Sequence, residues 1–340
     1  MKRTSRKKAE AGFNAVPGND RIKKILRLAL EKGRVPNSLI FSGPRGVGKR
    51  RLAFVLAQAI NCERGTAEPC GACAACLKIA NGKLPDVWAV EPDGQSIKIE
   101  QMQAVRQAAY VRPLAARRRV FIITEADKMT ADAANCMLKI LEEPPAYSHI
   151  ILVTSMAHLI LPTIKSRCQL LNFSPIGREE IKRALMEKGH PEDRAAVMAL
   201  LVNGNLEEAM KLDWEKVQER RREAWNVFAA LQRRGEASVL LRSYAFSKRE
   251  LVRDDFEKLL GVLASFCRDA SLLKTGGEAS LLLNPDYAEK LRTLETGWRS
   301  EEYTRCLNKI EQTFAGLKKS LNMSLLVMSF YSLMGEMRHG

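Results

Sequence analysis

The sequence lacks any apolar run close to the roughly 20 residues that a helix needs to cross a bilayer. Its charged opening, MKRTSRKKAE, also lacks the apolar stretch of a secretion signal. Acidic residues are scarce as well: 39 Asp and Glu face 55 Lys and Arg, which leaves a formal net charge of +16. These absences predict a cytoplasmic protein with no membrane contact and a positive field that attracts polyanions such as nucleic acid.

Part of the positive charge is concentrated at the amino terminus. Five basic residues fall close together there: Lys2, Arg3, Arg6, Lys7 and Lys8. A charge run of this kind is typical of a solvated, disordered tail. Direct contact of this tail with DNA is the alternative interpretation.

The chain of 340 residues is longer than a single hydrophobic core usually supports, which is about 250 residues. Up to Phe173, short apolar runs alternate with helix-patterned stretches, as expected for parallel strands joined by crossover helices. The expected strands are 39–42, 87–90, 120–124, 150–154 and 170–173. Beyond Pro175 helical periodicity takes over, with helices expected at 178–188, at 191–201 and from Trp214 onward. The sequence therefore predicts an α/β domain followed by all-α domains, with boundaries at 1–173, 174–213 and 214–340.

A glycine-rich segment with Gly43, Gly46, Gly48 and Lys49 follows the first expected strand and opens a helix. In phosphate-binding loops, backbone N–H groups receive phosphate oxygens, the lysine reaches the β- and γ-phosphates, and the next residue gives a hydroxyl to Mg²⁺. Here that next residue is Arg50, which has no oxygen and keeps its positive charge. We therefore expect no metal-assisted hydrolysis. A glycine-rich turn that no longer binds ATP is the favoured interpretation, and retained ATP binding is the alternative.

The second half of such a site is an apolar strand that ends in carboxylates, which hold Mg²⁺ and orient water. The expected strand 120–124 ends at Thr124, where the carboxylate on the magnesium side should stand. Glu125 and Asp127 follow one and three residues later. They are either remnants of the site or ordinary acidic residues at the start of a helix, where they suit the positive end of the dipole.

Four cysteines form a C-x7-C-x2-C-x2-C cluster in an insertion at about 61–80: Cys62, Cys70, Cys73 and Cys76. This spacing lets four thiolates surround one tetrahedral zinc ion. Two disulfides are the alternative, but clustered cysteines in a reducing compartment more often bind metal. Because four thiolates leave no open coordination position, the zinc is expected to be structural. The other four cysteines are isolated in the sequence: Cys136, Cys168, Cys267 and Cys306.

Two further motifs accompany the cysteine insertion, LKILEEPP at 138–145 and LPTIKSRC at 161–168. Together these features resemble one family, the AAA+ clamp-loader subunits of bacterial DNA polymerase III, over residues from about 13 to 213. The resemblance implies an AAA+ P-loop domain with a parallel sheet and a zinc insertion. It also implies a small helical lid domain and a C-terminal helical collar domain for oligomerisation.

The resemblance implies a role for Arg167 in the Ser-Arg-Cys motif. In the family this arginine reaches across a subunit interface to the ATP of a neighbour, so Arg167 is expected to act in trans as an arginine finger. A permanently charged, planar guanidinium suits that task. An ordinary surface salt bridge is the alternative. In motor subunits an arginine senses the γ-phosphate from a glycine-led segment of the lid, and here Glu207 stands near that position.

The departures at Arg50, Thr124 and Glu207 indicate a stationary, non-hydrolysing subunit of the loader, with no ATPase activity of its own. The resemblance implies the gamma/tau and delta subunits as partners, with the β sliding clamp reached indirectly and primed DNA in the assembly. The chain would then serve the DNA polymerase III holoenzyme in DNA replication. An active gamma/tau-like ATPase motor is one alternative, and a free-standing zinc DNA-binding protein is another.

Overall fold

The computed structural model describes residues 12–232, 253–278, 281–293, 298–318 and 323–336. The basic amino-terminal cluster, which was expected to be a tail, lies outside the described residues. By its internal contacts the chain divides into two compact units. Unit 1 comprises Met1–Lys188 and Asn203–Met210, and unit 2 comprises Gly189–Val202 and Lys211–Gly340.

Unit 1 is built on a five-stranded parallel sheet in the order β2-β3-β4-β1-β5. Its strands are β1 (Ser38–Ser42), β2 (Val87–Val90), β3 (Arg119–Ile123), β4 (Ser148–Thr154) and β5 (Gln169–Asn172). The strands predicted from apolar runs are confirmed, with ends shifted by one or two residues. The three central strands are buried along their whole length, because helices cover both faces of the sheet.

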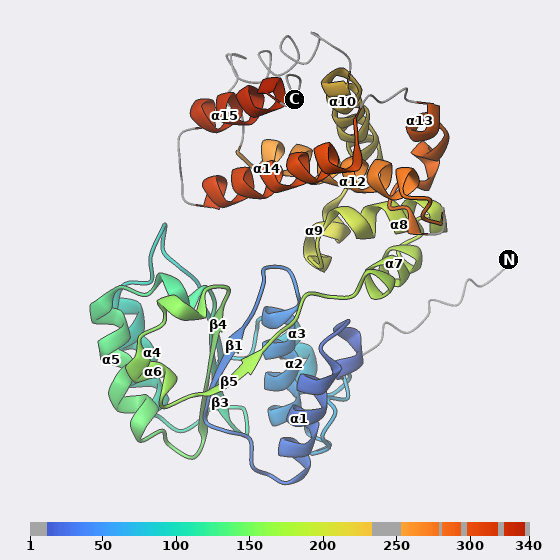
Figure 1. The fold of residues 1–340 in the computed structure, drawn as a ribbon. Coiled ribbons are helices and arrows are strands. Elements are labelled where there is room, and N and C mark those ends of the chain that lie inside the picture. Colours follow the sequence, from blue (N-terminus) through green and yellow to red (C-terminus); the bar gives the residue numbers. More distant parts are fainter. Residues whose placement is uncertain (1–11, 233–252, 279–280, 294–297, 319–322, 337–340) are drawn as a thin grey trace, which may run out of the picture. The chain divides into compact units, whose positions relative to one another are not determined.

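Helices cover the sheet in two layers (Figure 1). One side carries α1 (Asp20–Glu31), α2 (Lys49–Asn61) and α3 (Ala74–Ala80). The other side carries α4 (Ile99–Ala109), α5 (Ala131–Glu142) and α6 (Pro162–Lys165). Short 3-10 turns complete the unit at η1 (Gly12–Ala15), η2 (Ala126–Lys128) and η3 (Ala157–Leu159). Since crossover helices must return the chain to the same edge, the carboxyl ends of the strands share one edge, and the phosphate loop lies there.

The helices after the sheet are divided between the two units. The helices α7 (Arg178–Glu187) and α8 (Glu192–Leu201) confirm the two predicted helices to within a residue. By contacts, α7 and most of α9 (Leu206–Lys211) belong to unit 1, whereas α8 belongs to unit 2. The separate lid domain at 174–213 therefore remains a prediction.

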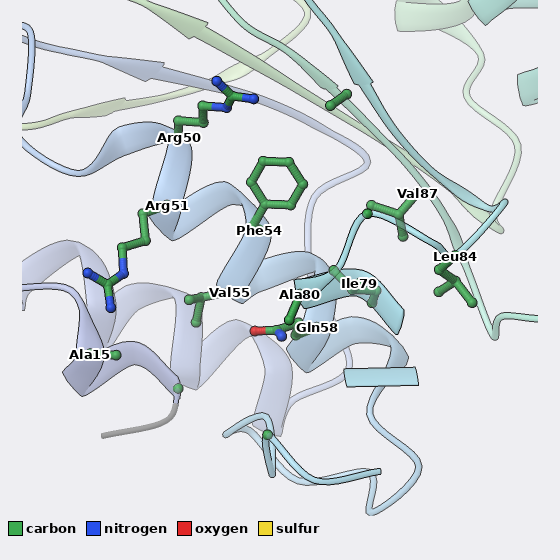
Figure 2. A pocket seen from close by; sticks show the side chains of 14 residues that line it. Ala15, Arg50, Arg51, Phe54, Val55, Gln58, Ile79, Ala80, Leu84 and Val87 are labelled. Carbon is green, nitrogen blue, oxygen red and sulfur yellow. The ribbon is translucent and has the colours of Figure 1, made fainter. Parts of the chain in front are cut away.

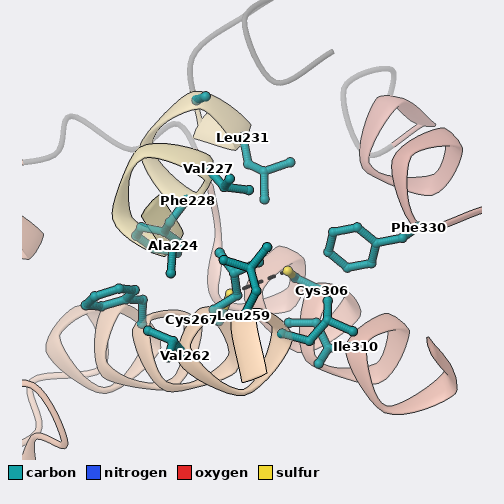
Figure 3. Close-up of a cluster of buried hydrophobic side chains, with 14 of the residues drawn as sticks. Ala224, Val227, Phe228, Leu231, Leu259, Val262, Cys267, Cys306, Ile310 and Phe330 are labelled. Carbon is teal, nitrogen blue, oxygen red and sulfur yellow. Dashed lines mark hydrogen bonds between the residues drawn. The ribbon is translucent and has the colours of Figure 1, made fainter. Parts of the chain in front are cut away.

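Unit 2 is helical in its described part, as its periodicity predicted. It contains α10 (Trp214–Gln232), α12 (Arg253–Lys274), η5 (Pro285–Tyr287), α13 (Ala288–Thr293), α14 (Ser300–Lys318) and α15 (Met323–Glu336). Figure 3 shows the core between these helices, where Phe228, Leu259, Ile310 and Phe330 converge. No helix of the described residues is long and apolar enough to span a membrane.

The structure pairs two of the cysteines that are isolated in the sequence. Cys267 of α12 and Cys306 of α14 lie in the core of unit 2 with their sulfur atoms 3.4 Å apart (Figure 3). The hydrogen bond with Cys306 and burial raise the pKa of the Cys267 thiol well above its usual range. Both residues therefore serve the core as thiols.

Candidate functional site

The glycine-rich loop has the backbone shape that its sequence predicts. It connects the end of β1 to the first residue of α2, and Gly46 and Gly48 have φ angles of 71° and 87°. Positive φ angles are strained for residues with a Cβ atom, so glycine is required at both positions. The loop therefore keeps the form of a phosphate cradle at the start of a helix.

The lysine of this loop is bound to the loop itself. Lys49 is buried, and its Nζ atom donates hydrogen bonds to the carbonyl oxygens of Gly43 and Pro44 at 2.5 Å each. Burial lowers the pKa of Lys49 to about 8, although the charge of Asp127 works in the opposite direction. A phosphate entering the loop would have to compete with these two carbonyl groups for the ammonium.

Arg50 occupies the position where a hydroxyl would ligate magnesium. Its guanidinium pairs with the carboxylate of Glu91 just after β2, and it lies 5.9 Å from the centre of the Phe54 ring. Figure 2 shows Arg50 and Arg51 on α2 beside a hollow of about 740 Å³, with Phe54 between the helix and Val87. Arg50, the residue after the loop lysine, is therefore already paired with a carboxylate of the chain.

The acidic half of the site is also engaged within the chain. Thr124, at the strand tip, is buried, and its hydroxyl donates to the carbonyl oxygen of Val90 at 3.0 Å. Glu125 pairs with Lys128 at 2.6 Å, and Asp127 accepts a hydrogen bond from the Thr154 hydroxyl at 2.5 Å. Both carboxylates are therefore already engaged by side chains of the chain.

The first turn of α9 and the residue before it, Asn205, lie against the phosphate loop. The backbone N–H of Glu207 donates to the carbonyl oxygen of Gly46 at 3.3 Å. A Cβ atom at Gly46 would lie only 1.5 Å from the side-chain oxygen of Asn205. Asn205 therefore occupies the space beside the loop, and sequence reasoning missed this residue because it considered only Glu207 as the sensor position.

The four predicted metal ligands come together in the structure. The Sγ atoms of Cys62, Cys70, Cys73 and Cys76 all lie within 4.8 Å of one another. Cys62 ends α2, Cys73 caps the amino terminus of α3, and Cys76 lies in its first turn. Since all four sulfurs converge on one point, this geometry suits a single tetrahedral ion better than two separate disulfides.

Backbone groups of the cluster already point at the sulfur atoms. The N–H of Cys73 lies 3.3 Å from the Cys70 sulfur, and that of Cys76 lies 3.4 Å from the Cys73 sulfur. Hydrogen bonds from the backbone of Ala72 and Cys73 lower the pKa of the Cys70 thiol to about 6. Since the thiolate is the metal-binding form, the backbone favours the charge state that zinc requires at Cys70. At Cys76, by contrast, burial raises the pKa of the thiol well above its usual range.

Arg167 follows α6 and pairs within its own chain. Its Nε atom donates to the carboxylate of Glu142 at 2.8 Å, and its Nη1 atom donates to the carbonyl oxygen of Thr163 at 2.9 Å. The side chain is still 33% exposed. The arginine is thus held at the surface in the salt bridge that the alternative interpretation expected, with part of its guanidinium accessible.

These features define a class of protein: a P-loop domain of the AAA+ type with an intact glycine-rich loop, in which Lys49 is bound to backbone carbonyl groups and Arg50 to a carboxylate of the chain. The family described as DNA polymerase III, delta subunit matches residues 18–177. Subunit delta' of Bacillus subtilis DNA polymerase III is 35% identical over 266 residues, which are 77% of this chain and 80% of that protein. The chain belongs to this family of DNA polymerase III clamp-loader subunits.

Other relatives share part of the chain. Subunit gamma/tau of Mycobacterium tuberculosis is 39% identical over 164 residues, which cover 48% of this chain and 28% of that protein. A crystal structure of a gamma subunit-related protein from Thermotoga maritima has 21% sequence identity and a TM-score of 0.44, with 93% of this chain and 99% of that chain covered. The expected membership of the clamp-loader family is confirmed by the Bacillus relative, which is a subunit delta'.

Proposed function

We propose that this chain is the stationary subunit of its clamp loader and does not hydrolyse ATP. The observation that carries the proposal is the Arg50–Glu91 ion pair, which stands where a nucleotide site needs a metal ligand. Lys49 and Thr124 support the same proposal, because both side chains are hydrogen-bonded to backbone carbonyl groups of the chain. Because these three residues of the phosphate loop and strand tip are bound within the chain, the domain would serve the loader by binding its other subunits and not by hydrolysing ATP.

The partners would be the gamma/tau and delta subunits, with the β sliding clamp reached through the assembly and primed DNA as its target. Contact would be made by the AAA+ domain and by the helical domain from residue 214, acting as a collar. A cytoplasmic location, expected from the sequence, fits this role.

Arg167 would act on the ATP of a neighbouring gamma/tau subunit. Its present partner, Glu142, is half exposed, so the pair lies near water and contributes little to stability, about 0–1 kcal/mol. Arg167 could therefore leave this carboxylate and bind the phosphate oxygens of a neighbour's ATP at little cost in free energy. A guanidinium in that position stabilises charge that develops on the transferred phosphoryl group.

A zinc ion would be held by Cys62, Cys70, Cys73 and Cys76 and would have a structural role. The four sulfurs fill a tetrahedral coordination sphere, so no position remains for a reacting water. The ion would join the end of α2 to the start of α3 and so fix the insertion.

Reconstitution of the loader tests the proposal. In a complex with gamma/tau and delta, Arg167→Ala should leave assembly intact and lower ATP turnover by a factor on the order of 10³. Lys165→Ala removes a nearby positive charge and should keep turnover near the wild-type value. Unchanged turnover in the Arg167→Ala complex would leave the arginine with a structural role only.

Turnover also separates the two readings of the phosphate loop. If gamma/tau carries a disabled phosphate loop and the complex still hydrolyses ATP, then this chain is an active motor and the stationary role is wrong. If hydrolysis disappears with the gamma/tau site, the stationary role is supported.

A further inference from the structure

Unit 1 contains a second cavity, of about 240 Å³, at the end of the sheet opposite to the phosphate loop. Residues that precede β1, β3 and β4 line it, including Asn37, Arg118 and Ala146. The end of α2 and the cysteine insertion supply further walls through Ile60 and Thr66. Because β1 begins beside this cavity and ends at Gly43, the cavity is separate from the nucleotide site.

The cavity is lined by positive charge that the described part of the chain does not neutralise. Arg117 and Arg118 both line it, and its lining contains no aspartate or glutamate. Arg117 donates to the carbonyl oxygen of Glu63 at 2.9 Å, and Arg118 donates to that of Ala146 at 2.5 Å. Carbonyl groups orient a guanidinium without cancelling its charge, and each guanidinium has five N–H donors. Both arginines therefore keep donors and charge for a ligand.

The segment that carries these arginines is fixed in place. Asp86 is fully buried, accepts hydrogen bonds from the backbone N–H groups of 114–116, and pairs with Arg119 at 2.8 Å. The backbone N–H of Arg118 donates to the side chain of Asn61 at 2.8 Å. The two guanidiniums are thus carried by a segment that is anchored on either side, which lowers the entropy lost when a ligand binds.

Two other walls of the cavity favour a tetrahedral oxyanion. Gly65 has a φ angle of 65°, and a Cβ atom there would lie 3.3 Å from Nη1 of Arg117, so glycine leaves room for the guanidinium. His149 is 94% buried, and its Nδ1 atom lies 3.1 Å from the carbonyl oxygen of Pro36, which can only accept. Nδ1 therefore carries the proton, and the neutral ring forms one wall of the cavity without adding a negative charge.

We propose that this cavity binds a phosphate group through the guanidiniums of Arg117 and Arg118, with His149 as a further wall. A guanidinium matches the oxygens of phosphate in both charge and geometry, and two of them line this cavity. Glu63, Gly65 and Thr66 belong to the segment between the first two cysteines, so the cavity is complete only when the cysteine insertion is folded. The site therefore links occupancy by phosphate to the integrity of the metal cluster.

Titration of the full, metal-loaded chain with inorganic phosphate, followed by calorimetry, tests the proposal. Wild-type protein should show saturable binding, and Arg117→Ala and Arg118→Ala should each weaken it about tenfold or more, as expected for a lost charge-assisted hydrogen bond. Arg183→Ala removes an exposed arginine of α7 and should bind phosphate as the wild type does. Arg117→Lys and Arg118→Lys keep the charge and should weaken binding less than the alanine variants do.

A parallel titration with adenosine monophosphate identifies the source of the phosphate. Tighter binding of the mononucleotide than of inorganic phosphate indicates a nucleotide phosphate, and the reverse order indicates the free anion; either order supports the site if it depends on Arg117 and Arg118. Absence of saturable binding by the wild type overturns the proposal. So does binding that survives in the Arg117→Ala/Arg118→Ala protein but is lost in Lys49→Ala, because the anion then lies in the phosphate loop.

Discussion

The two ends of helix α2 carry two kinds of site that differ in the state of their polar groups. At its amino end, Lys49 and Arg50 are bound to groups of the protein, two carbonyl oxygens and a carboxylate. At its carboxyl end, Cys62 joins three other cysteines whose sulfurs converge without forming disulfides. The polar groups at the amino end are bound within the chain, whereas the four sulfurs at the carboxyl end are arranged so that one ion could bind them all.

This difference shows that the backbone shape of a phosphate loop can be present while its charged side chains are bound within the chain. The positive φ angles of Gly46 and Gly48 preserve the cradle, but its chemistry depends on side chains that are free to meet a ligand. Once Arg50 pairs with Glu91, the positive charge of the site is balanced inside the chain. If the chain is the stationary subunit proposed above, its fold keeps the backbone geometry of a nucleotide site and serves the loader through assembly.

Removal of one thiolate should have the largest effect. Cys73→Ser should reduce bound zinc from about one equivalent to a small fraction, because it removes one of the four ligands. A complete four-ligand site in an isolated peptide has a zinc-binding free energy of about 10–16 kcal/mol. Metal analysis of the purified protein measures this directly. Cys136→Ser, in α5, is the matched control and should retain the ion. Equal metal content in both variants would mean that the four cysteines do not form a zinc site.

Most of the fold was predictable from the sequence, because it depends on local periodicity. Strands such as β3 and β4 are largely continuous apolar runs, and α7 follows its amphipathic pattern. The cysteine cluster was predictable for a similar reason, since three of its four ligands lie within seven residues.

The partners of the charged side chains were not predictable. Arg50 and Glu91 are 41 residues apart, and Arg167 and Glu142 are 25 apart, so no local pattern identifies either pair. The pairing depends on how β2 and α5 approach the sites in three dimensions. Asn205 was missed for the same reason, because its place beside Gly46 follows from the packing of α9.

The buried ammonium of Lys49, at the amino end of α2, should make the free energy of unfolding depend on pH, by up to about 3 kcal/mol. The pKa of Lys49 is about 8 in the folded chain, against 10.5 when it is exposed. Between these values the unfolded state holds more protons, so the free energy of unfolding should rise with pH through this window. The difference between wild type and Lys49→Met in urea unfolding at pH 7.5 to 10.5 should show the rise. Lys24→Met, at an exposed lysine of α1, should follow the wild-type curve, and parallel curves for Lys49→Met would show that the ammonium is not desolvated.

The side-chain cap of α9 should contribute a smaller amount to the free energy of unfolding. The side chain of Asn205 accepts a hydrogen bond from the N–H of Glu208 at 3.0 Å and so caps α9. Asn205→Ala should lower the free energy of unfolding by about 1 kcal/mol, and Asn205→Ser, which keeps a capping oxygen, should lose less. Denaturant titration distinguishes the two variants, and identical losses would exclude a capping role.

Restoring the missing hydroxyl should have the smallest effect. Arg50→Thr breaks an exposed ion pair with Glu91, which should change stability by less than about 1 kcal/mol. We expect the variant to remain without detectable hydrolysis, because Thr124 still stands in place of a carboxylate and Lys49 stays bound to the loop. Strong ATPase activity in Arg50→Thr would show that Arg50 alone disables the amino end of α2.

The most direct test of the account is the hydrolysis of ATP by the purified, metal-loaded chain in the presence of Mg²⁺. A loop whose lysine, arginine and strand-tip residue are all bound within the protein should give no release of phosphate above background, and Lys49→Ala should not change that value. Magnesium-dependent hydrolysis that disappears in Lys49→Ala would contradict the account and identify the chain as an active motor.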